Sequence, residues 1–299
     1  MTSVRKRSIR GRNYYYLVHT FRLKGKVRTA EVYLGRTVPD NLEPAARQLL
    51  AIEWTEKWIP LFETIQKRFW EEQRGTPREV QQQNAEAFAI HFTYDTNRIE
   101  GSRLTLQETA AVLSYGLTPA SKPLADVLEA RLHAKLLERI LKSTDRSLTQ
   151  DRLLQWHRDL FSETKPLISG QLRTYPIAIG GSRFTPPLPR EVPGLMRQFH
   201  SWYRHSQRSL HPLHLAGAAH LRFESIHPFG DGNGRVGRLL LNFVLNSRHF
   251  PLFDLPYNRR MGYYKALETA SVEKDEAIFL RWFFREYVRQ YRRLLSVKD

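Results

Sequence analysis

A polar, glycine-rich stretch that runs directly into an apolar one is the most constraining feature of this 299-residue chain. His227-Pro-Phe-Gly-Asp-Gly-Asn-Gly-Arg-Val-Gly-Arg238 holds one histidine, one carboxylate, four glycines and two arginines, and an apolar run to Leu245 follows at once. This order predicts a loop that opens a buried helix. The first turn of such a helix offers unpaired backbone N–H groups and the positive end of the helix dipole. The stretch therefore predicts an anion-binding helix N-terminus.

The side chains of this stretch are those that phosphate chemistry needs. Arg235 and Arg238 are three residues apart, so both project from one helix face as phosphate-binding forks. Asp231 offers the oxygen ligand that Mg²⁺ prefers, and His227 is a natural proton acceptor near neutral pH. Phe229 is expected to be a core anchor that fixes the loop. The residues alone predict a phosphate-handling site with a metal ligand and a general base.

The stretch also resembles the signature of the Fic family, H-x-F-x-D-G-N-G-R-x-x-R, at every defining position. Fic enzymes transfer AMP from ATP to a hydroxyl of a target protein, so the resemblance implies a protein adenylyltransferase that uses ATP and Mg²⁺. It implies that His227 takes the proton of a Ser, Thr or Tyr hydroxyl and that Asp231 holds the metal. It assigns the ATP phosphates to backbone and side-chain groups of Gly232, Asn233, Gly234, Arg235 and Arg238, with the Asn233 side chain as an added donor.

Two positions bear on which nucleotide chemistry is implied. Relatives of the Doc type carry Lys in place of Gly234 and act as kinases, so glycine here implies nucleotidyl transfer, with UMP or GMP left as alternatives to AMP. Tyr264 stands where Fic proteins place an adenine-contacting tyrosine, although either Tyr263 or Tyr264 is as well suited to the core. Ser271 replaces an Asn that relatives often carry, which leaves the purine selectivity open.

A second motif lies well before the first. Thr96-Asn-Arg-Ile-Glu100-Gly101 resembles the inhibitory motif (S/T)-x-x-x-E-(G/N) of Fic proteins. Glu100 at a helix end would pair with Arg238 and take the place of the γ-phosphate. The resemblance implies the class with an N-terminal inhibitory helix, here at about residues 88–101, and an autoinhibited enzyme. In some relatives the equivalent glutamate also positions a water that removes AMP from the target, so de-AMPylation is a second implied activity.

The rest of the chain predicts a mainly α-helical fold with two β segments. Apolar residues recur at helical spacing from Leu49 to Phe69, and Thr105-Leu-Gln-Glu108 matches a capping box.

Residues 175–179 predict a short hairpin. It resembles the Fic flap that lies over the active site, and Ile179, Gly180 and Gly181 would dock the target there. Residues 13–34, with a turn at Lys24-Gly25-Lys26, predict an N-terminal β-hairpin. Further helices are expected at 79–97, 123–142, 149–162, 190–206, 211–226, 234–247, 262–271 and 275–295.

We expect three segments along the chain. Residues 1–45 would form the basic N-terminal β-hairpin module, residues 46–78 a connecting helix, and residues 79–299 the Fic catalytic domain. The chain contains no cysteine, which excludes disulfides and thiolate sites. It also has no run of 18 apolar residues and no apolar signal region near its start. A cytoplasmic protein without membrane contacts is the expectation.

The charge of the chain suggests an anionic partner. The net charge is +17, and residues 1–40 hold ten Lys or Arg against Glu31 and Asp40. The alternative function is therefore a nucleic-acid-binding regulator that uses the basic hairpin and keeps the Fic domain for auto-modification or sensing. A hairpin docked on the catalytic domain, a homodimer contact or a protein-docking module would explain the same residues.

Overall fold

The computed structural model describes residues 2–23 and 25–296, which divide into two compact units. One unit extends to Lys67 and includes the segment from Arg293 onward, and the other runs from Arg68 to Arg292. Lys24, which the sequence places in a turn, lies outside the described residues. Every helix in the described ranges is too short or too polar to cross a lipid bilayer. The finer division expected at residues 45 and 78 stays a prediction.

The N-terminal unit is a three-stranded antiparallel sheet with strand order β1-β2-β3. The expected hairpin is confirmed by β2 (Arg12–Leu23) and β3 (Lys26–Gly35), whereas β1 (Thr2–Ile9) is a third strand that the sequence did not predict. The β1–β2 turn consists of Arg10 and Gly11, both at positive φ. A two-residue turn with both residues at positive φ matches the twist of the paired strands. The usual sequence signal for such a turn is Asn, Asp or Gly at its first position, so Arg10 gave no indication of it.

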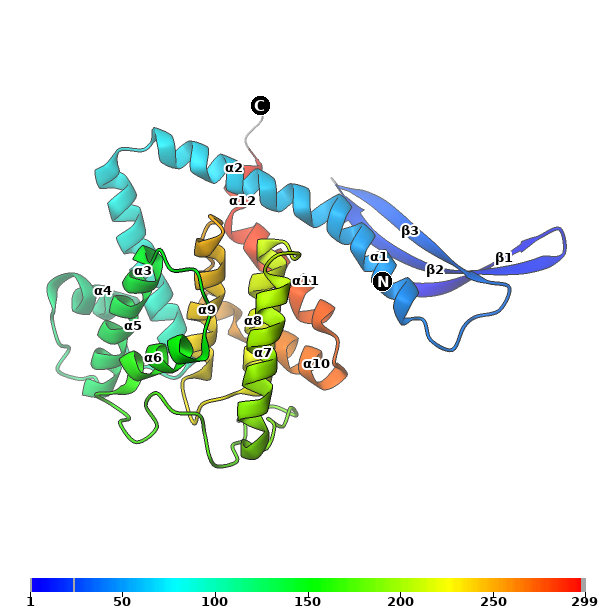
Figure 1. The fold of residues 1–299 in the computed structure, drawn as a ribbon. Helices are drawn as coiled ribbons and strands as arrows, with labels where there is room; N and C mark the ends of the chain where they lie inside the picture. Colours follow the sequence, from blue (N-terminus) through cyan, green and yellow to red (C-terminus); the bar gives the residue numbers. More distant parts are fainter. Residues whose placement is uncertain (1, 24, 297–299) are drawn as a thin grey trace. The chain divides into compact units, whose positions relative to one another are not determined.

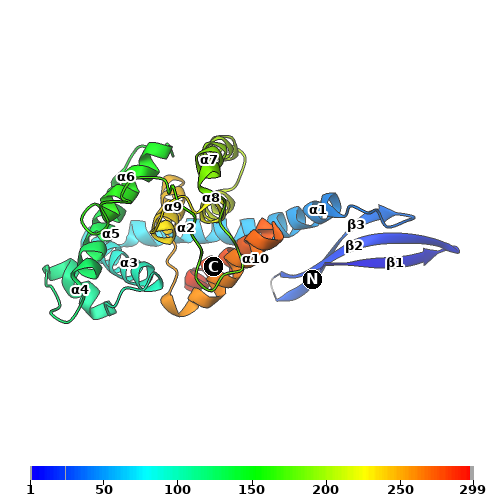
Figure 2. The ribbon, with the colours of Figure 1, turned by 90° about the horizontal axis from the view of Figure 1, so that it is seen from below.

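Helix α1 (Glu43–Glu53) covers one face of this sheet, and Figure 2 shows it running along the strands. Leu17, Phe21 and Ala30 pack with Leu49 of α1 in a buried cluster. The helix continues through a π-helical turn, Trp54–Trp58, into α2 (Ile59–Gly75). Pro60 has no N–H to donate, which explains why the helical hydrogen bonding widens just before it.

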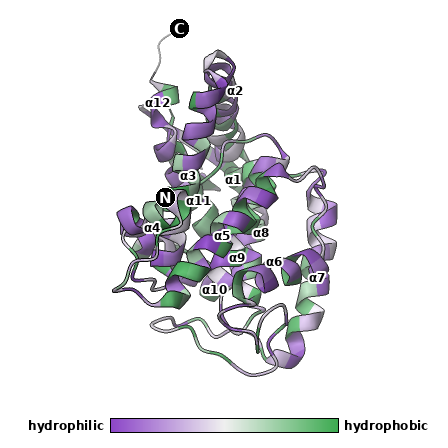
Figure 3. Cartoon of the chain, turned by 90° about the vertical axis from the view of Figure 1, so that its left-hand side faces the viewer, coloured by the Kyte–Doolittle hydropathy of each residue, from purple (hydrophilic) through white to green (hydrophobic). Residues whose placement is uncertain are grey.

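The described part of the second unit contains helices and loops, which confirms the helical domain but not its expected β-hairpin flap, and its core surrounds α9 (Asn233–Ser247). Thirteen of the fifteen residues of α9 are buried. Figures 1 and 2 show α9 between α5 and α8. Figure 3 shows hydrophobic and hydrophilic residues mixed within α6 and α7, as expected of helices with one buried face. The other helices of this unit are α3 (Arg78–Ile99), α4 (Leu106–Tyr115), α5 (Leu124–Lys142), α6 (Gln150–Phe161), α7 (Val192–Ser206), α8 (Pro212–Ile226), α10 (Arg260–Glu273) and α11 (Glu276–Gln290), with short 3-10 turns at Pro189–Glu191 and Tyr257–Arg259. The short helix α12 (Arg292–Leu295) belongs mostly to the first unit.

These elements confirm the expected mainly α fold, including the capping box at Thr105 and Glu108. The single helix expected at 275–295 is instead divided at Tyr291. The expected hairpin at 175–179 is also wrong, because residues 171–188 contain no strand. A single turn marks this flap loop: the Ser182 N–H donates to the Ile179 carbonyl at 3.1 Å, with Gly181 at φ +75°. Four of residues 176–189 are prolines, which cannot donate the hydrogen bonds of a strand ladder.

Candidate active site

The predicted catalytic loop lies between two residues in left-handed backbone conformation. His227 ends α8 at φ +51°, and Gly232 precedes α9 at φ +80°. A left-handed conformation is common for glycine but uncommon for histidine, and it costs on the order of 1 kcal/mol or more. The chain therefore reverses sharply at His227, and the N-terminus of α9 follows within six residues.

The His227 ring is oriented by its own helix. Its Nδ1 lies 3.2 Å from the carbonyl oxygen of Glu224, and its side chain is 19% exposed. Burial lowers the pKa of His227, although this hydrogen bond and the charge of Glu100 oppose the shift. The imidazole is therefore neutral near pH 7. Because Nδ1 donates its proton to the carbonyl, Nε2 is left as the acceptor nitrogen.

Asn233 and Phe229 fix the shape of the loop. The Asn233 amide accepts from the Phe229 N–H and donates to the Phe229 carbonyl, both at 2.9 Å. The Phe229 ring is fully buried and stacks on His157 with centroids 3.9 Å apart. Phe229 is thus an anchor, as expected. The Asn233 side chain thus holds the loop in shape, and its expected role as an anion donor stays a prediction.

His157 is one of several supports that the sequence analysis missed. Burial lowers its pKa to about 4, so the ring is neutral. Its Nδ1 accepts from the Gly170 N–H and its Nε2 donates to the Asp231 carbonyl, both at 2.9 Å. His157 thereby ties the catalytic loop to the start of the flap loop. A lone histidine within an amphipathic helix carries no sequence signal of such a role.

Arg173 is a second missed support. It is almost fully buried, and burial lowers its pKa. Its Nε donates to the His227 carbonyl at 2.8 Å and its Nη2 to the Pro187 carbonyl at 2.6 Å. One guanidinium therefore holds the left-handed turn at His227 and the far end of the flap loop together.

Asp231 and Arg235 belong to a four-residue charge cluster. The Asp231 carboxylate lies 2.5 Å from the ammonium of Lys165, which also lies 3.3 Å from Glu129. Arg235 pairs with Glu129 and lies over the Phe161 ring. Burial opposes ionisation of Asp231, but the Lys165 hydrogen bond and the charge of Arg235 outweigh it and lower its pKa. The cluster holds an ionised Asp231 with a cation already beside it. Lys165 and Glu129 were missed, because neither belongs to a motif.

Arg238 is engaged by the C-terminal end of α3. Its Nη2 donates to the Glu100 carboxylate at 2.6 Å and to the Thr96 carbonyl at 3.1 Å. Burial opposes the charge of Arg238, but the Glu100 carboxylate raises its pKa. Its Nη1 is buried and makes no hydrogen bond with any described residue. The two motifs of the sequence therefore meet through one ion pair. Arg235 and Arg238, expected to act as a pair, are held by different helices.

Gly234 stands beside this ion pair. A Cβ added there would overlap the Glu100 carboxylate and would lie 2.9 Å from Arg238 Nη1. The space that the missing side chain leaves open is therefore filled by Glu100. The Gly232 N–H is already hydrogen-bonded to the Asp231 carboxylate, so the free N–H groups of this helix end begin after it.

The two candidate tyrosines lie in different surroundings. Tyr263 is buried, and its hydroxyl lies 2.9 Å from His220 Nε2. Tyr264 is 42% exposed and donates to the Ile99 carbonyl at 3.0 Å, which places it beside the C-terminal end of α3. In the flap, Gly180 and Gly181 are exposed and Ile179 is half-buried. Arg183 joins this loop to Glu268 of α10.

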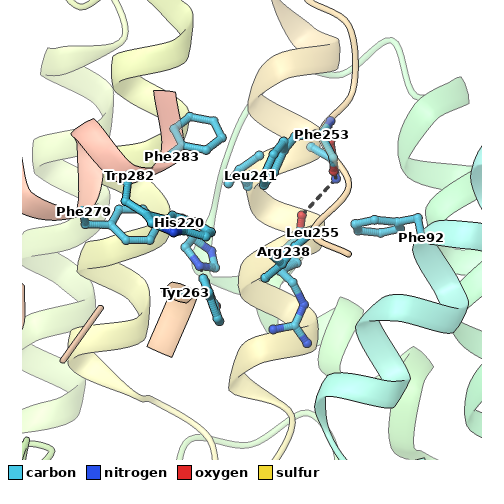
Figure 4. Close-up of a pocket in the computed structure, with 11 residues that line it drawn as sticks. Phe92, His220, Arg238, Leu241, Phe253, Leu255, Tyr263, Phe279, Trp282 and Phe283 are labelled. Atoms are coloured by element: carbon cyan, nitrogen blue, oxygen red, sulfur yellow. Dashed lines mark hydrogen bonds between the residues drawn. The ribbon is translucent and has the colours of Figure 1, made fainter. Parts of the chain in front are cut away.

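A small cavity lies on the core side of Arg238 and not on the side where Arg238 meets Glu100. Figure 4 shows its lining, with the guanidinium of Arg238 pointing away from Phe279, Trp282 and Phe283. Its free volume is about 10 Å³, room for roughly one water molecule. This cavity is therefore part of the core and too small for a nucleotide.

Comparison with known proteins agrees with the geometry. Residues 147–245 match the Fic/DOC family. The chain is 32% identical over 206 residues to a protein adenylyltransferase Fic of Drosophila grimshawi, which covers 66% of this chain and 41% of the relative. It is also 32% identical over 187 residues to protein adenylyltransferase fic-1 of Caenorhabditis elegans, which covers 60% of this chain and 36% of that relative. The chain thus spans about two fifths of the length of these curated relatives.

Solved structures extend the likeness to most of the chain. A Fic domain containing signaling protein from Bacteroides thetaiotaomicron superposes with a TM-score of 0.70 at 26% identity, covering 78% of this chain and 96% of that one. Fic-1 of Caenorhabditis elegans gives a TM-score of 0.67 at 25% identity, covering 85% and 78%. With the complete motif folded at a helix N-terminus, residues 147–245 of this chain form a Fic/DOC domain.

Proposed function

We propose that this chain is a protein adenylyltransferase that transfers AMP from ATP to a Ser, Thr or Tyr hydroxyl of a target protein. One arrangement carries the proposal: His227, with a free acceptor nitrogen, ends α8 just before the N-terminus of α9. A base and an anion site therefore belong to one short loop. The loop lies within the residues that match the Fic/DOC family, and relatives that align with 66% and 60% of the chain are named protein adenylyltransferase.

The residues present account for each part of the transfer. Nε2 of His227 takes the hydroxyl proton, and the hydroxyl oxygen attacks the α-phosphorus of ATP. The bond from that phosphorus to the pyrophosphate oxygen breaks, and pyrophosphate leaves. Charge that builds up on the phosphates is stabilised by the first-turn N–H groups of Gly234 and Arg235. The proposed purine contact is Tyr264, and the proposed target-docking segment is Ile179, Gly180 and Gly181.

The carboxylate cluster suits Mg²⁺. Asp231 is ionised and is 42% exposed, and Glu129 lies on the other side of Lys165. The ammonium between these carboxylates marks a position where positive charge is favoured. Mg²⁺ held by Asp231 would neutralise the charge of the ATP phosphates during transfer.

Glu100 is proposed to hold the enzyme inactive. Its carboxylate lies on Arg238 and fills the space beside Gly234, where the γ-phosphate of ATP would need Arg238. A carboxylate and a phosphate cannot share one guanidinium edge without repulsion. ATP therefore binds productively only when the end of α3 releases Arg238. The same glutamate would position a water for the reverse removal of AMP.

The test is label transfer from ATP that carries ³²P in the α-phosphate. Glu100→Gly should raise incorporation into the chain itself or into lysate proteins by about tenfold or more, which corresponds to removal of roughly 1.4 kcal/mol of competition. Glu100→Gly with His227→Ala should lose roughly 100-fold or more of this activity. Label from γ-³²P ATP would indicate a kinase instead. No gain in the Glu100 variant would refute the autoinhibition, and labelling that survives His227→Ala would refute the proposed chemistry.

A further inference from the structure

One face of the N-terminal sheet is not covered by α1 and carries none of the residues proposed for AMP transfer; Val18 on this face is buried, whereas the arginines around it are exposed. Side chains of a strand alternate between the two faces, and Leu17 and Phe21 face α1. The opposite face of β2 therefore carries Arg12, Tyr14, Tyr16 and Arg22. The strand register extends this open face over the neighbouring strands.

The centre of the open face is an aromatic group with an arginine over it. On β1, Arg5 lies opposite Tyr16 of β2, and Arg7 lies opposite Tyr14. On β3, Tyr33 lies opposite Tyr16. The Tyr16 and Tyr33 rings lie 5.3 Å apart, and Tyr33 is 52% exposed. The Arg7 guanidinium lies 4.6 Å from the Tyr16 ring centroid. These contacts give the centre of the face a fixed form.

The open face carries an unbalanced positive charge. Its single acid, Glu31, is engaged by both Nη atoms of Arg7, at 2.8 and 2.6 Å. Arg5, Arg12 and Arg22 are exposed, and none of them forms an ion pair with a described residue. On the other face, by contrast, Arg28 is bonded to Glu56. The arginines without an ion pair to a described residue, Arg5, Arg12 and Arg22, thus lie on the side that α1 leaves uncovered, whereas the α1 side carries Lys6 and Lys26.

We propose that this open face binds double-stranded DNA, with the sheet lying in the major groove. The axes of the two outer strands of a three-stranded sheet lie about 10 Å apart, and the major groove of B-DNA is about 12 Å wide. Arg12 and Arg22 are ten residues apart on one face of β2, a distance of about 34 Å along the strand. Arginines at both ends of the sheet therefore reach phosphates where the strands leave the groove. The right-handed twist of the sheet follows the groove.

The shape of the sheet and the packing of its tyrosines favour a DNA duplex over an RNA duplex or a single strand as the ligand. The major groove of an RNA duplex is too narrow and deep for side chains to read. Single strands bind where aromatic rings are free to stack on bases, but here Arg7 covers Tyr16 and the tyrosines pack on one another. The proposal does not depend on AMP transfer, since it uses no residue of the catalytic loop.

The test is fluorescence anisotropy of the full chain with a labelled 24-base-pair DNA duplex of mixed sequence, between 50 and 200 mM KCl. Arg12→Ala with Arg22→Ala should weaken binding about tenfold or more. The same pair should lower the slope of log Kd against log salt by about two, because each phosphate contact contributes about one unit. The matched control is Lys6→Ala with Lys26→Ala, which removes the same charge from the α1 side of the sheet and should change Kd by less than about twofold.

Three results would overturn the proposal. The wild-type chain could fail to bind the duplex at 50 mM KCl, or both double variants could lose affinity equally. Tighter binding of the matching single strand or RNA duplex would assign the face to a different nucleic acid. Label transfer by both double variants in the Glu100→Gly background should remain unchanged, which shows that the rest of the chain is folded.

Discussion

The carboxylate of Glu100 occupies the space that glycine leaves open at position 234. A methyl group at Gly234 would overlap that carboxylate. The glycine that keeps the anion site open for phosphate also makes room for the group that closes it. Its two roles are therefore separable by a double-mutant cycle.

Gly234→Ala should destabilise the wild-type chain by about 1–3 kcal/mol, because overpacking a filled site is costly, and Tm should fall by roughly 2–4 °C per kcal/mol. In the Glu100→Gly background the cost should be smaller by about 1 kcal/mol, since the main obstacle is gone. Thermal unfolding of the four chains measures this. Gly194→Ala is the control, because its added Cβ would lie 3.8 Å from the nearest side-chain atom, a guanidinium nitrogen of Arg197. Additive effects of Gly234→Ala and Glu100→Gly would contradict the proposed overlap.

Lys165 holds the Asp231 carboxylate and would compete with the proposed metal ion for it. Lys165→Met should lower the Mg²⁺ concentration for half-maximal label transfer by about two- to fivefold in the Glu100→Gly background, since a partly exposed ion pair is worth up to roughly 1 kcal/mol. Mn²⁺ binding followed by electron paramagnetic resonance should tighten in parallel. Lys142→Met, which breaks only an exposed pair with Glu138, is the control. An unchanged or higher Mg²⁺ requirement would show that Lys165 serves the nucleotide rather than excluding the metal.

The acid limb of the pH profile reports on His227. Burial lowers its pKa from the ordinary value of 6.5, so the neutral, proton-accepting form persists at lower pH than for an exposed histidine. The kcat/KM of the Glu100→Gly chain should therefore level off as pH rises towards 6.5 and should fall only below that value. A midpoint at or above pH 6.5 would place the base in a different environment.

Glu224 makes stability depend on pH. Burial raises its pKa to about 8 from 4.5, so the folded chain keeps a proton that the unfolded chain releases. Its contribution to stability is complete below about pH 4.5 and is lost as pH rises to about 8. Glu224→Gln cannot ionise, so its Tm relative to wild type should increase between pH 5 and pH 9. A constant difference across this range would show that Glu224 ionises normally in the folded state.

The sequence was informative where chemistry requires several residues at fixed spacing. His227, Asp231 and Arg238 stand within twelve residues, and Glu100 belongs to its own short motif, so the pairing of Glu100 with Arg238 was predictable. The residues that hold the loop and its charged side chains in place could not be predicted from the sequence. Arg173, Lys165 and Glu129 are single residues whose roles depend on tertiary contacts.

The two failures in secondary structure have local causes. Residues 175–179 have strand-like composition, but the surrounding prolines prevent a ladder, and the loop is held instead by Arg173. Strand β1 contains mostly polar residues and lies at the edge of the sheet, so no hydrophobic alternation marks it. In both cases the structure of the segment depends on tertiary contacts, with β2 for β1 and with Arg173 for the loop.

The site as it stands has internally matched charges. Asp231 has Lys165, Arg235 has Glu129 and Arg238 has Glu100. Under the proposed function, nucleotide entry at such a site would be an ion exchange, in which phosphate would replace a carboxylate on Arg238 and a divalent cation would replace an ammonium at Asp231. The two substitutions compensate each other in charge, so neither the nucleotide nor the metal alone should occupy the site as readily as both together.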